Sequence, residues 1–170
     1  MKRFFAVNIM CAVIALLSGC GYKVGYLMHP QIATVAVAPV KNETLAYNAA
    51  SVLQQKLSEV FTTDGSLTLK SISKADCIVY ARILKVSYAE ISGHISENDD
   101  FLPNEWRVTV EVEYSVILPG RAKPLIGPQV VSGDAEFVSD ADLENSRING
   151  VNQALFNAAR TVVANLTEAW

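Results

Sequence analysis

The feature that most constrains the fold is a strict alternation of apolar and polar residues beyond the middle of the chain. Apolar or aromatic residues occupy every second position from Trp106 to Leu118. Successive side chains of a β-strand point to opposite faces of a sheet, so this pattern predicts a strand with one buried face and one polar face. The polar positions are Arg107, Thr109, Glu111, Glu113 and Ser115.

Further strands are predicted on both sides of this one. Residues 34–38 are a near-continuous apolar run that ends at Pro39, typical of a strand buried on both faces. Alternation or β-branched and aromatic residues predict strands at 67–72, 76–92 and 130–138. Arg82 interrupts the apolar face of the strand at 76–92, so one face is expected either to change register there or to project beyond its neighbours. The residues of that face are Ile78, Tyr80, Leu84, Val86 and Tyr88.

Two segments have apolar residues at helical spacing. The first, residues 46–61, is expected to use Asn42 or Thr44 as its N-cap and to end near Gly65 in a left-handed conformation. The second is expected to begin at Ser139 or Asp140, with an apolar stripe from Ile148 to Leu166. The order of elements predicts an α+β fold: a two-layer sandwich with a mostly antiparallel, four- to five-stranded sheet and both amphipathic helices packed on one face.

The N-terminus has the pattern of a bacterial lipoprotein signal. Lys2 and Arg3 precede an apolar run that is too short to span a bilayer and that ends in Leu17-Ser18-Gly19-Cys20, a lipobox. We therefore predict a signal peptide at residues 1–19, acylation of Cys20, a lipidated arm at 20–33 and one α+β domain at 34–170. Gly21 is not Asp, and by analogy with lipoprotein sorting this favours the outer membrane, with the domain facing the periplasm.

Charge and cysteine content exclude several classes of protein. The net charge of −3 becomes −5 once Lys2 and Arg3 leave with the signal, so no global basic field would attract nucleic acid. Cys11 leaves with the signal and Cys20 is used for the lipid. Cys77 alone remains, which excludes a disulfide framework and favours a small buried side chain.

The residues offer no catalytic constellation. His29 and His94 have no Cys or His at ligand spacing, and Asp99-Asp100 is an adjacent pair in a predicted loop, more typical of solvated charge than of a general acid and base. No nucleophile elbow or phosphate-binding glycine loop occurs. We expect no enzyme activity, no cofactor and no metal.

Two groups of residues are candidates for binding. Arg121 and Lys123 lie in a turn-rich loop and could meet phosphate or carboxylate groups, with Arg107 nearby, although a solvated loop explains them as well. Ile95, Phe101 and Leu102 lie in a predicted polar hairpin loop at residues 93–104. Apolar residues at a loop tip are costly unless they are covered, so these three are candidates for contact with a partner.

Several short motifs together resemble the lipopolysaccharide-assembly lipoproteins, the LptE family. They are Cys20-Gly21-Tyr22, Thr34-Val35-Ala36-Val37, Asn42-Glu43-Thr44, the strand entry Ala75-Asp76 and a final helix that closes on Trp170. The resemblance implies an outer-membrane lipoprotein that plugs an LptD-type β-barrel and assists the insertion of lipopolysaccharide, which it could bind directly. The family often has Gly where this chain has Tyr80-Ala81-Arg82. Asn149, Asn152, Asn157 and Arg160 on the final helix would suit a polar barrel lumen or plain solvent.

An alternative stays open. The same start, Val35-Ala36-Val37 with Asn42-Glu43-Thr44 before a helix, resembles lipoproteins that activate periplasmic cell-wall synthases or form secretion pores. Those folds depend on parallel strands that alternate with helices. The consecutive long antiparallel strands predicted here favour the lipopolysaccharide-assembly family instead, and a small periplasmic hydrolase comes third.

Overall fold

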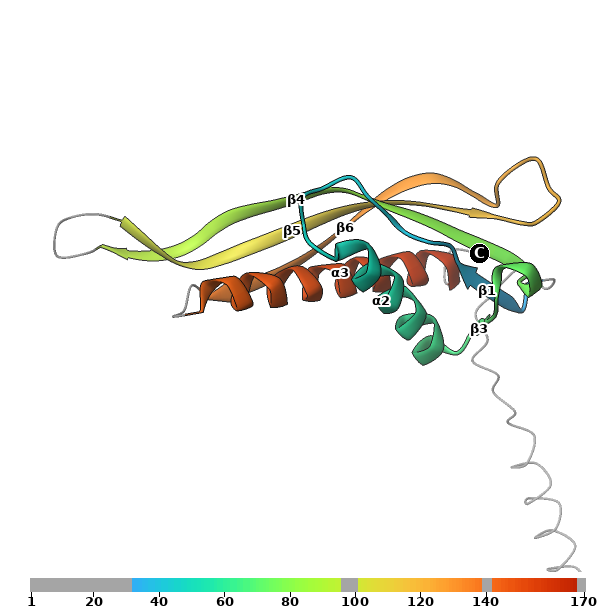
Figure 1. The fold of residues 1–170 in the computed structure, drawn as a ribbon, viewed down its shortest axis with the longest axis horizontal. Coiled ribbons are helices and arrows are strands. Elements are labelled where there is room, and N and C mark those ends of the chain that lie inside the picture. Colours follow the sequence, from blue (N-terminus) through green and yellow to red (C-terminus); the bar gives the residue numbers. More distant parts are fainter. Residues whose placement is uncertain (1–31, 96–100, 139–141, 168–170) are drawn as a thin grey trace, which may run out of the picture.

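The computed structural model describes residues 32–95, 101–138 and 142–167. The elements, in chain order, are β1 (Thr34–Val37), β2 (Lys41–Asn42), α2 (Ala49–Asp64), β3 (Thr68–Leu69), the 3-10 turn η1 (Ile72–Lys74), β4 (Cys77–Ile95), β5 (Phe101–Ile117), β6 (Ile126–Val138) and α3 (Leu143–Thr167). The sheet has the order β3-β1-β4-β5-β6, and β2 pairs with β4 beyond β1. Both helices lie on one face of this sheet, as predicted (Figure 1).

The sheet is mixed, with six strands instead of the predicted four or five. β4, β5 and β6 form a long antiparallel meander, whereas β1 pairs in parallel with β3 and β4, and β2 pairs in parallel with β4. The connection from β1 to β3 passes through α2, and such a crossover is what a parallel pair requires. The predicted strand at 67–72 is reduced to the two residues of β3, followed by η1.

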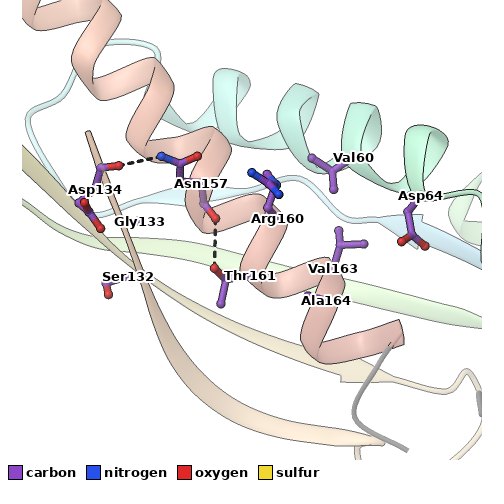
Figure 2. Close-up of a pocket in the computed structure, with 10 residues that line it drawn as sticks. All are labelled: Val60, Asp64, Ser132, Gly133, Asp134, Asn157, Arg160, Thr161, Val163 and Ala164. Carbon is purple, nitrogen blue, oxygen red and sulfur yellow. Dashed lines mark hydrogen bonds between the residues drawn. The ribbon is translucent and has the colours of Figure 1, made fainter. Parts of the chain in front are cut away.

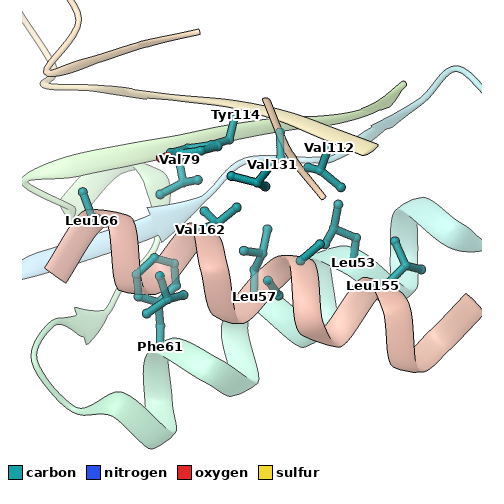
Figure 3. Packing of buried hydrophobic residues seen from close by; sticks show 14 of the residues in the cluster. Leu53, Leu57, Phe61, Val79, Val112, Tyr114, Val131, Leu155, Val162 and Leu166 are labelled. Carbon is teal, nitrogen blue, oxygen red and sulfur yellow. The ribbon is translucent and has the colours of Figure 1, made fainter. Parts of the chain in front are cut away.

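The core lies between the helices and one face of the sheet. Val79, Val112, Tyr114 and Val131 from the strands meet apolar side chains from both helices, all with at most 9% of their surface exposed (Figure 3). The helical contributors in this view are Leu53, Leu57, Phe61, Leu155, Val162 and Leu166. Burial of each such side chain contributes about 1.5–3 kcal/mol relative to leaving it in water, so this layer holds the fold together.

Gly133 sets the distance between β6 and α3. A Cβ atom at this position would lie 2.2 Å from the carbonyl oxygen of Ala154 and 2.3 Å from the amide nitrogen of Ala158. Backbone therefore packs directly against backbone, and the small side chains of Ala154 and Ala158 complete the contact. Glycine is therefore the residue that fits at position 133 without a shift of this backbone.

The start of α2 differs from the prediction, whereas its end agrees. Asn42 and Thr44 are not caps: the Asn42 side chain closes a turn by accepting from the Thr44 amide at 3.0 Å. The helix begins later, after Asn48, which has a left-handed φ of 56° and whose side chain makes no capping hydrogen bond. At the other end Gly65 is left-handed, with a φ of 71°, and donates its amide to the Phe61 carbonyl at 3.1 Å.

The register shift expected near Arg82 is present, between Ile83 and Lys85. Tyr80 and Arg82 lie on the face without helices, whereas Val86 and Tyr88, beyond the shift, pack against the core. The prediction that Tyr80 and Val86 share one apolar face was therefore wrong. The irregularity moves the residues after Ile83 to the opposite side of the sheet.

The end of the β4–β5 hairpin is more regular than predicted. Ile95 pairs with Phe101 and His94 with Leu102, so these residues belong to strands and not to a loop that begins at Gly93. At the start of α3 the predicted caps Ser139 and Asp140 lie outside the described residues. Asp142 accepts a hydrogen bond from the Asn145 amide at 3.2 Å instead. Ile148, predicted to be buried, is 45% exposed.

Candidate functional site

The predicted binding residues lie at opposite ends of the sheet. Arg121 and Lys123 are exposed in the loop after β5, whereas Phe101 begins β5 at the hairpin end (Figure 1). A strand of 17 residues spans about 55 Å, so the two groups cannot form one site. Arg107 is not near Arg121: it pairs across strands with Glu136. Cys20 and the side chains of Ile95, Phe101 and Leu102 fall outside the described part of the structure, so their roles stay predictions.

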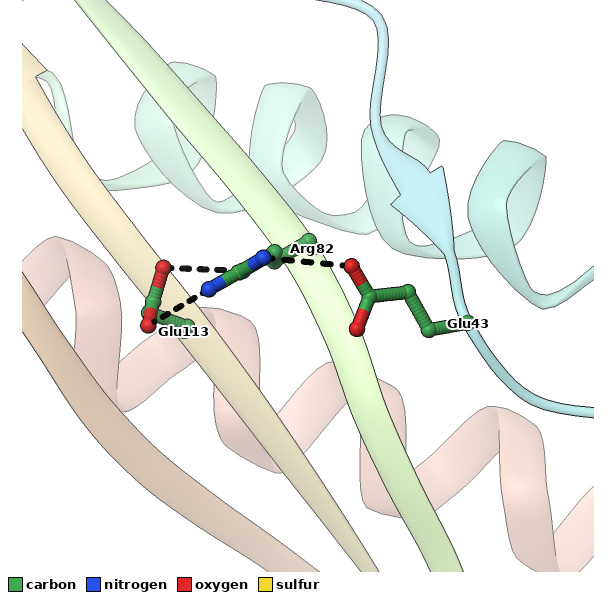
Figure 4. Close-up of polar contacts among 3 residues, drawn as sticks. All are labelled: Glu43, Arg82 and Glu113. Carbon is green, nitrogen blue, oxygen red and sulfur yellow. Dashed lines mark hydrogen bonds and ion pairs between the residues drawn. The ribbon is translucent and has the colours of Figure 1, made fainter.

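The open face of the sheet carries cross-strand ion pairs. Arg82 on β4 donates to both carboxylate oxygens of Glu113 on β5, at 2.9 and 3.1 Å, and to Glu43 at 3.2 Å (Figure 4). The hydrogen bond to Glu113, the charge of Glu113 and then the charge of Glu43 raise the pKa of Arg82. A planar guanidinium held by two carboxylates is fixed in orientation as well as in charge.

The same arrangement continues along this face. Arg107 pairs with Glu136 on β6, which raises the pKa of Arg107 first through the hydrogen bond and then through the charge, and Lys85 lies 3.9 Å from Glu111. These side chains remain partly exposed. The face therefore presents an ordered array of paired charges to whatever lies above it, suited to a polar, hydrogen-bonding surface and not to an apolar one.

A polar cleft of about 550 Å³ lies between α2, α3 and β6 (Figure 2). Asn157 crosses it and donates to the carbonyl oxygen of Asp134 at 2.8 Å, which ties α3 to the edge of the sheet. Arg160 is exposed and lines the cleft from α3 together with Thr161, whereas Asp64 lines it from the end of α2. Of the helix residues thought suitable for a polar lumen, Asn149 and Arg160 are exposed, while Asn152 and Asn157 are half-buried.

A second groove, of about 460 Å³, lies between the segment that precedes α2 and the first half of α3. Leu45 and Tyr47 form one wall, and Tyr88, Arg147 and apolar residues of α3 line the rest. No sequence motif predicted this groove. The available signal was the position of Leu45 and Tyr47, which are large and apolar yet fall off the helical stripe of residues 46–61.

The titratable groups near β1 have structural partners. Asp76 accepts from the Thr34 hydroxyl at 2.7 Å and from the amides of Ala33 and Thr34, which lowers the pKa of its carboxyl. Cys77 is buried, and burial followed by the charge of Asp76 raises its pKa to about 11, so the thiol is protonated at neutral pH. Within the described ranges no three His, Cys, Asp or Glu residues gather as a metal site would require.

These features define a class of protein. The described residues form an α+β body that carries a charged sheet face and two grooves, which are surfaces suited to binding. Over the part of the chain that the structure describes, no helix combines the length and apolar character needed to cross a membrane.

Comparison with known protein families identifies the family of this chain. The chain belongs to the LptE family, described as lipopolysaccharide-assembly, whose model matches residues 32–168. A search of curated proteins found no match. The family match confirms the resemblance seen in the short sequence motifs.

Solved structures share the fold at low identity. A protein from Xanthomonas campestris is 10% identical, with 84% of this chain and 91% of that chain covered and a TM-score of 0.56. A minor lipoprotein from Acinetobacter baumannii is 9% identical, with 81% and 94% covered and a TM-score of 0.53. A PelC dodecamer from Paraburkholderia phytofirmans is 11% identical, with 82% and 93% covered and a TM-score of 0.52. At these identities the likeness establishes the fold alone.

Proposed function

We propose that this member of the lipopolysaccharide-assembly family is an outer-membrane lipoprotein without enzyme activity, anchored through acylated Cys20 and facing the periplasm. It acts as plug and assembly partner of an LptD-type β-barrel and assists the insertion of lipopolysaccharide into the outer leaflet. The observation that carries the proposal is the family match over residues 32–168. The proposed function requires no cofactor and no nucleic acid.

The open sheet face supports the choice of partner. The interior of a large outer-membrane barrel is polar, so a plug must offer it charged and hydrogen-bonding side chains. The paired charges of Arg82, Glu113 and Arg107 offer such a surface along the middle of β5. Arg121 and Lys123, exposed beyond the end of that strand, remain candidates for contact with lipopolysaccharide phosphates.

Purification tests the proposal. The full-length chain, extracted from outer membranes in mild detergent, is expected to co-isolate a large β-barrel, and depletion of the chain is expected to raise permeability to bulky antibiotics. A Cys20→Ser variant is expected to lose lipid labelling. A chain that is unacylated, or that purifies without a barrel from membranes, would overturn the proposal.

The alternative function keeps one structural argument in its favour. β1 pairs in parallel with β3 and β4 through a helical crossover, a feature typical of the activators of cell-wall synthases and of the secretion-pore lipoproteins considered from the sequence. The long antiparallel meander remains the larger part of the sheet. Retrieval of a cell-wall synthase, or of a ring of identical chains, in the same purification would place this alternative first.

A further inference from the structure

The segment that leads from the end of α2 into β4 contains an exposed run. Residues 68–74, which include β3 and η1, are all exposed. Two of them, Leu69 and Ile72, are large and apolar, with 36% and 45% of their surface exposed. Two others, Lys70 and Lys74, have no ion-pair partner in the part of the chain that the structure describes. The run therefore combines unpaired positive charge with apolar surface.

Backbone hydrogen bonds hold this run at the edge of the sheet. The Thr68 amide donates to the carbonyl oxygen of Ala33 at 3.0 Å, and the Lys70 amide donates to that of Val35 at 2.8 Å. The turn η1 follows and carries Ile72. The side chains therefore project from a backbone that is already ordered, which reduces the entropy lost on contact with a partner.

A second basic segment lies at the same end of the sheet. Ile78, near the start of β4, pairs with Ile117, the last residue of β5. The turn η1, which precedes β4, and the loop at residues 118–125, which follows β5, therefore lie at one end of the sheet (Figure 1). This loop carries Arg121 and Lys123, both exposed.

This end of the sheet is basic. Residues 65–75 and 118–125 together hold four cations and no carboxylate. Asp64 and Asp76 flank the first of these ranges, and both carboxylates accept hydrogen bonds from backbone amides. The four cations outnumber these two carboxylates even when both are counted, so the charge of this end favours contact with an anionic surface.

The predicted lipid anchor also reaches the fold at this end. Ile32, the first described residue, is 8% exposed and belongs to the core, and the next residue, Ala33, is the one that Thr68 contacts. Cys20 lies twelve residues before Ile32, and a chain of that length spans at most about 40 Å. Such a tether raises the effective concentration of the basic end at the membrane. The hairpin end of the sheet lies about 55 Å away, the length of β5.

We propose that residues 68–74 are a membrane-contact surface that seats on anionic phospholipid headgroups in the leaflet that holds the anchor. The two lysines of this run meet headgroup phosphates, and its two large apolar side chains enter the interfacial layer beside them. The basic loop at 118–125 adds to the attraction. The inference rests on the proposed acylation of Cys20 and adds an orientation: the end of the sheet with this surface lies at the periplasmic rim of the barrel, next to the bilayer.

Labels at two matched positions test the contact. Ile72 and Ile148 are each 45% exposed, so Ile72→Cys and Ile148→Cys are made in the acylated full chain and coupled to a fluorophore. Cys77 is buried and stays unlabelled. In vesicles of equal parts phosphatidylcholine and phosphatidylglycerol, a nitroxide on the lipid headgroup is expected to quench the label at position 72 and not the label at position 148. Equal quenching of the two labels, or no quenching at position 72, would overturn the membrane contact.

Substitution of the two lysines tests the kind of lipid. The double variant Lys70→Gln with Lys74→Gln is expected to lower the ratio of contacting to free chains by about tenfold or more, because each cation near an anionic surface contributes about fivefold. The double variant Lys70→Arg with Lys74→Arg keeps both charges and should behave as the parent. Full quenching in the Gln variant, or in vesicles of phosphatidylcholine alone, would contradict contact with anionic headgroups.

Two further controls identify other occupants of the surface. Quenching at position 72 that appears only when lipopolysaccharide is added to the vesicles would overturn the assignment to phospholipid. Loss of quenching when the chain is diluted among more vesicles would show that contact requires a second copy, and would do the same. Lys70 and Lys74 are exposed, so an unchanged thermal midpoint, within about 1 °C, shows that the variants keep the fold.

The membrane-contact surface and the proposed function can fail separately. The vesicle assay contains the chain and lipid alone, so its result does not depend on a barrel. Co-isolation of a barrel by a chain whose label at position 72 stays in water would remove the surface and leave the proposed function in place. A quenched label at position 72, in a chain that purifies without a barrel, would do the reverse.

Discussion

The two faces of β5 differ sharply although their residues alternate along one strand. Val108, Val110 and Val112 have no exposed surface beneath the helices, while Arg107 and Glu113 lie on the open face in ion pairs with neighbouring strands. Exposed ion pairs contribute little to stability, whereas buried apolar side chains contribute most of it. The comparison indicates that one face holds the fold and that the other is available for recognition.

Removal of a side chain from the covered face should have the largest effect. Leu57→Ala is expected to lower the free energy of unfolding by about 2–5 kcal/mol, because Leu57 is fully buried and its loss leaves a cavity between the helices and the sheet. Urea denaturation of the full-length chain in detergent measures the change. Gln55→Ala, at an exposed position of the same helix, is the control, and equal losses for the two variants would contradict the assignment of the core.

Addition of one methyl group to the covered face should come next. Gly133→Ala is expected to cost about 1–3 kcal/mol, because the new Cβ would overlap backbone atoms of Ala154 and Ala158 and force α3 away from β6. Gly127→Ala on the same strand is the matched control, since its Cβ would meet nothing within 4 Å. Similar stability of the two variants would show that the helix does not lie directly on the strand.

The sequence predicted the covered face better than the positions of the strand ends. Alternation from Val108 to Val116 requires only local periodicity, so the buried residues of β5 were found correctly. The register shift at Ile83 was anticipated through Arg82, but its consequence for the side chains beyond it was not, because one strand's pattern does not show how its partner is paired. The parallel pairing of β1 was missed because the pattern of a strand does not show which strands lie beside it or in which direction they run.

The candidate sites were harder to predict than the fold. Arg121 and Lys123 were chosen as cations in a loop, and a sequence does not show that this loop lies a whole strand away from Phe101. The groove at Tyr47 and Tyr88 joins residues 41 positions apart, so only the tertiary structure brings them together. Asn42 was expected to cap a helix, yet its side chain holds the loop that displays Leu45.

A smaller effect, dependent on pH, is expected at the end of the sheet. Thr34 and the adjacent amides lower the pKa of Asp76 in the folded state, so the carboxylate stabilises the fold above the unfolded pKa, and this stabilisation is lost as the pH falls through the folded value. Asp76→Ala should therefore be less stable than the parent at neutral pH, and the difference should shrink as the pH falls below about 4.

Urea midpoints measured across that pH range check the prediction for Asp76. Thr34→Val, which keeps the shape of the side chain but removes the hydroxyl that donates at 2.7 Å, should give an intermediate pH dependence. A difference between Asp76→Ala and the parent that stayed constant down to the lowest pH would show that the carboxylate charge contributes nothing to the link between β1 and β4.

The open face should give the smallest change in stability and the clearest change in binding. Glu113→Lys removes the carboxylate that Arg82 contacts at 2.9 and 3.1 Å and places two cations side by side, yet both positions stay solvated, so the urea midpoint should shift less than for any covered-face variant. If this face meets the polar wall of a barrel, the reversed charge should still reduce the barrel that co-isolates and raise antibiotic permeability. Normal co-isolation with normal permeability would show that the ion pairs of this face do not take part in binding the barrel. Their role would then be limited to the pairing of β4 with β5, because the variant changes no residue of the covered face.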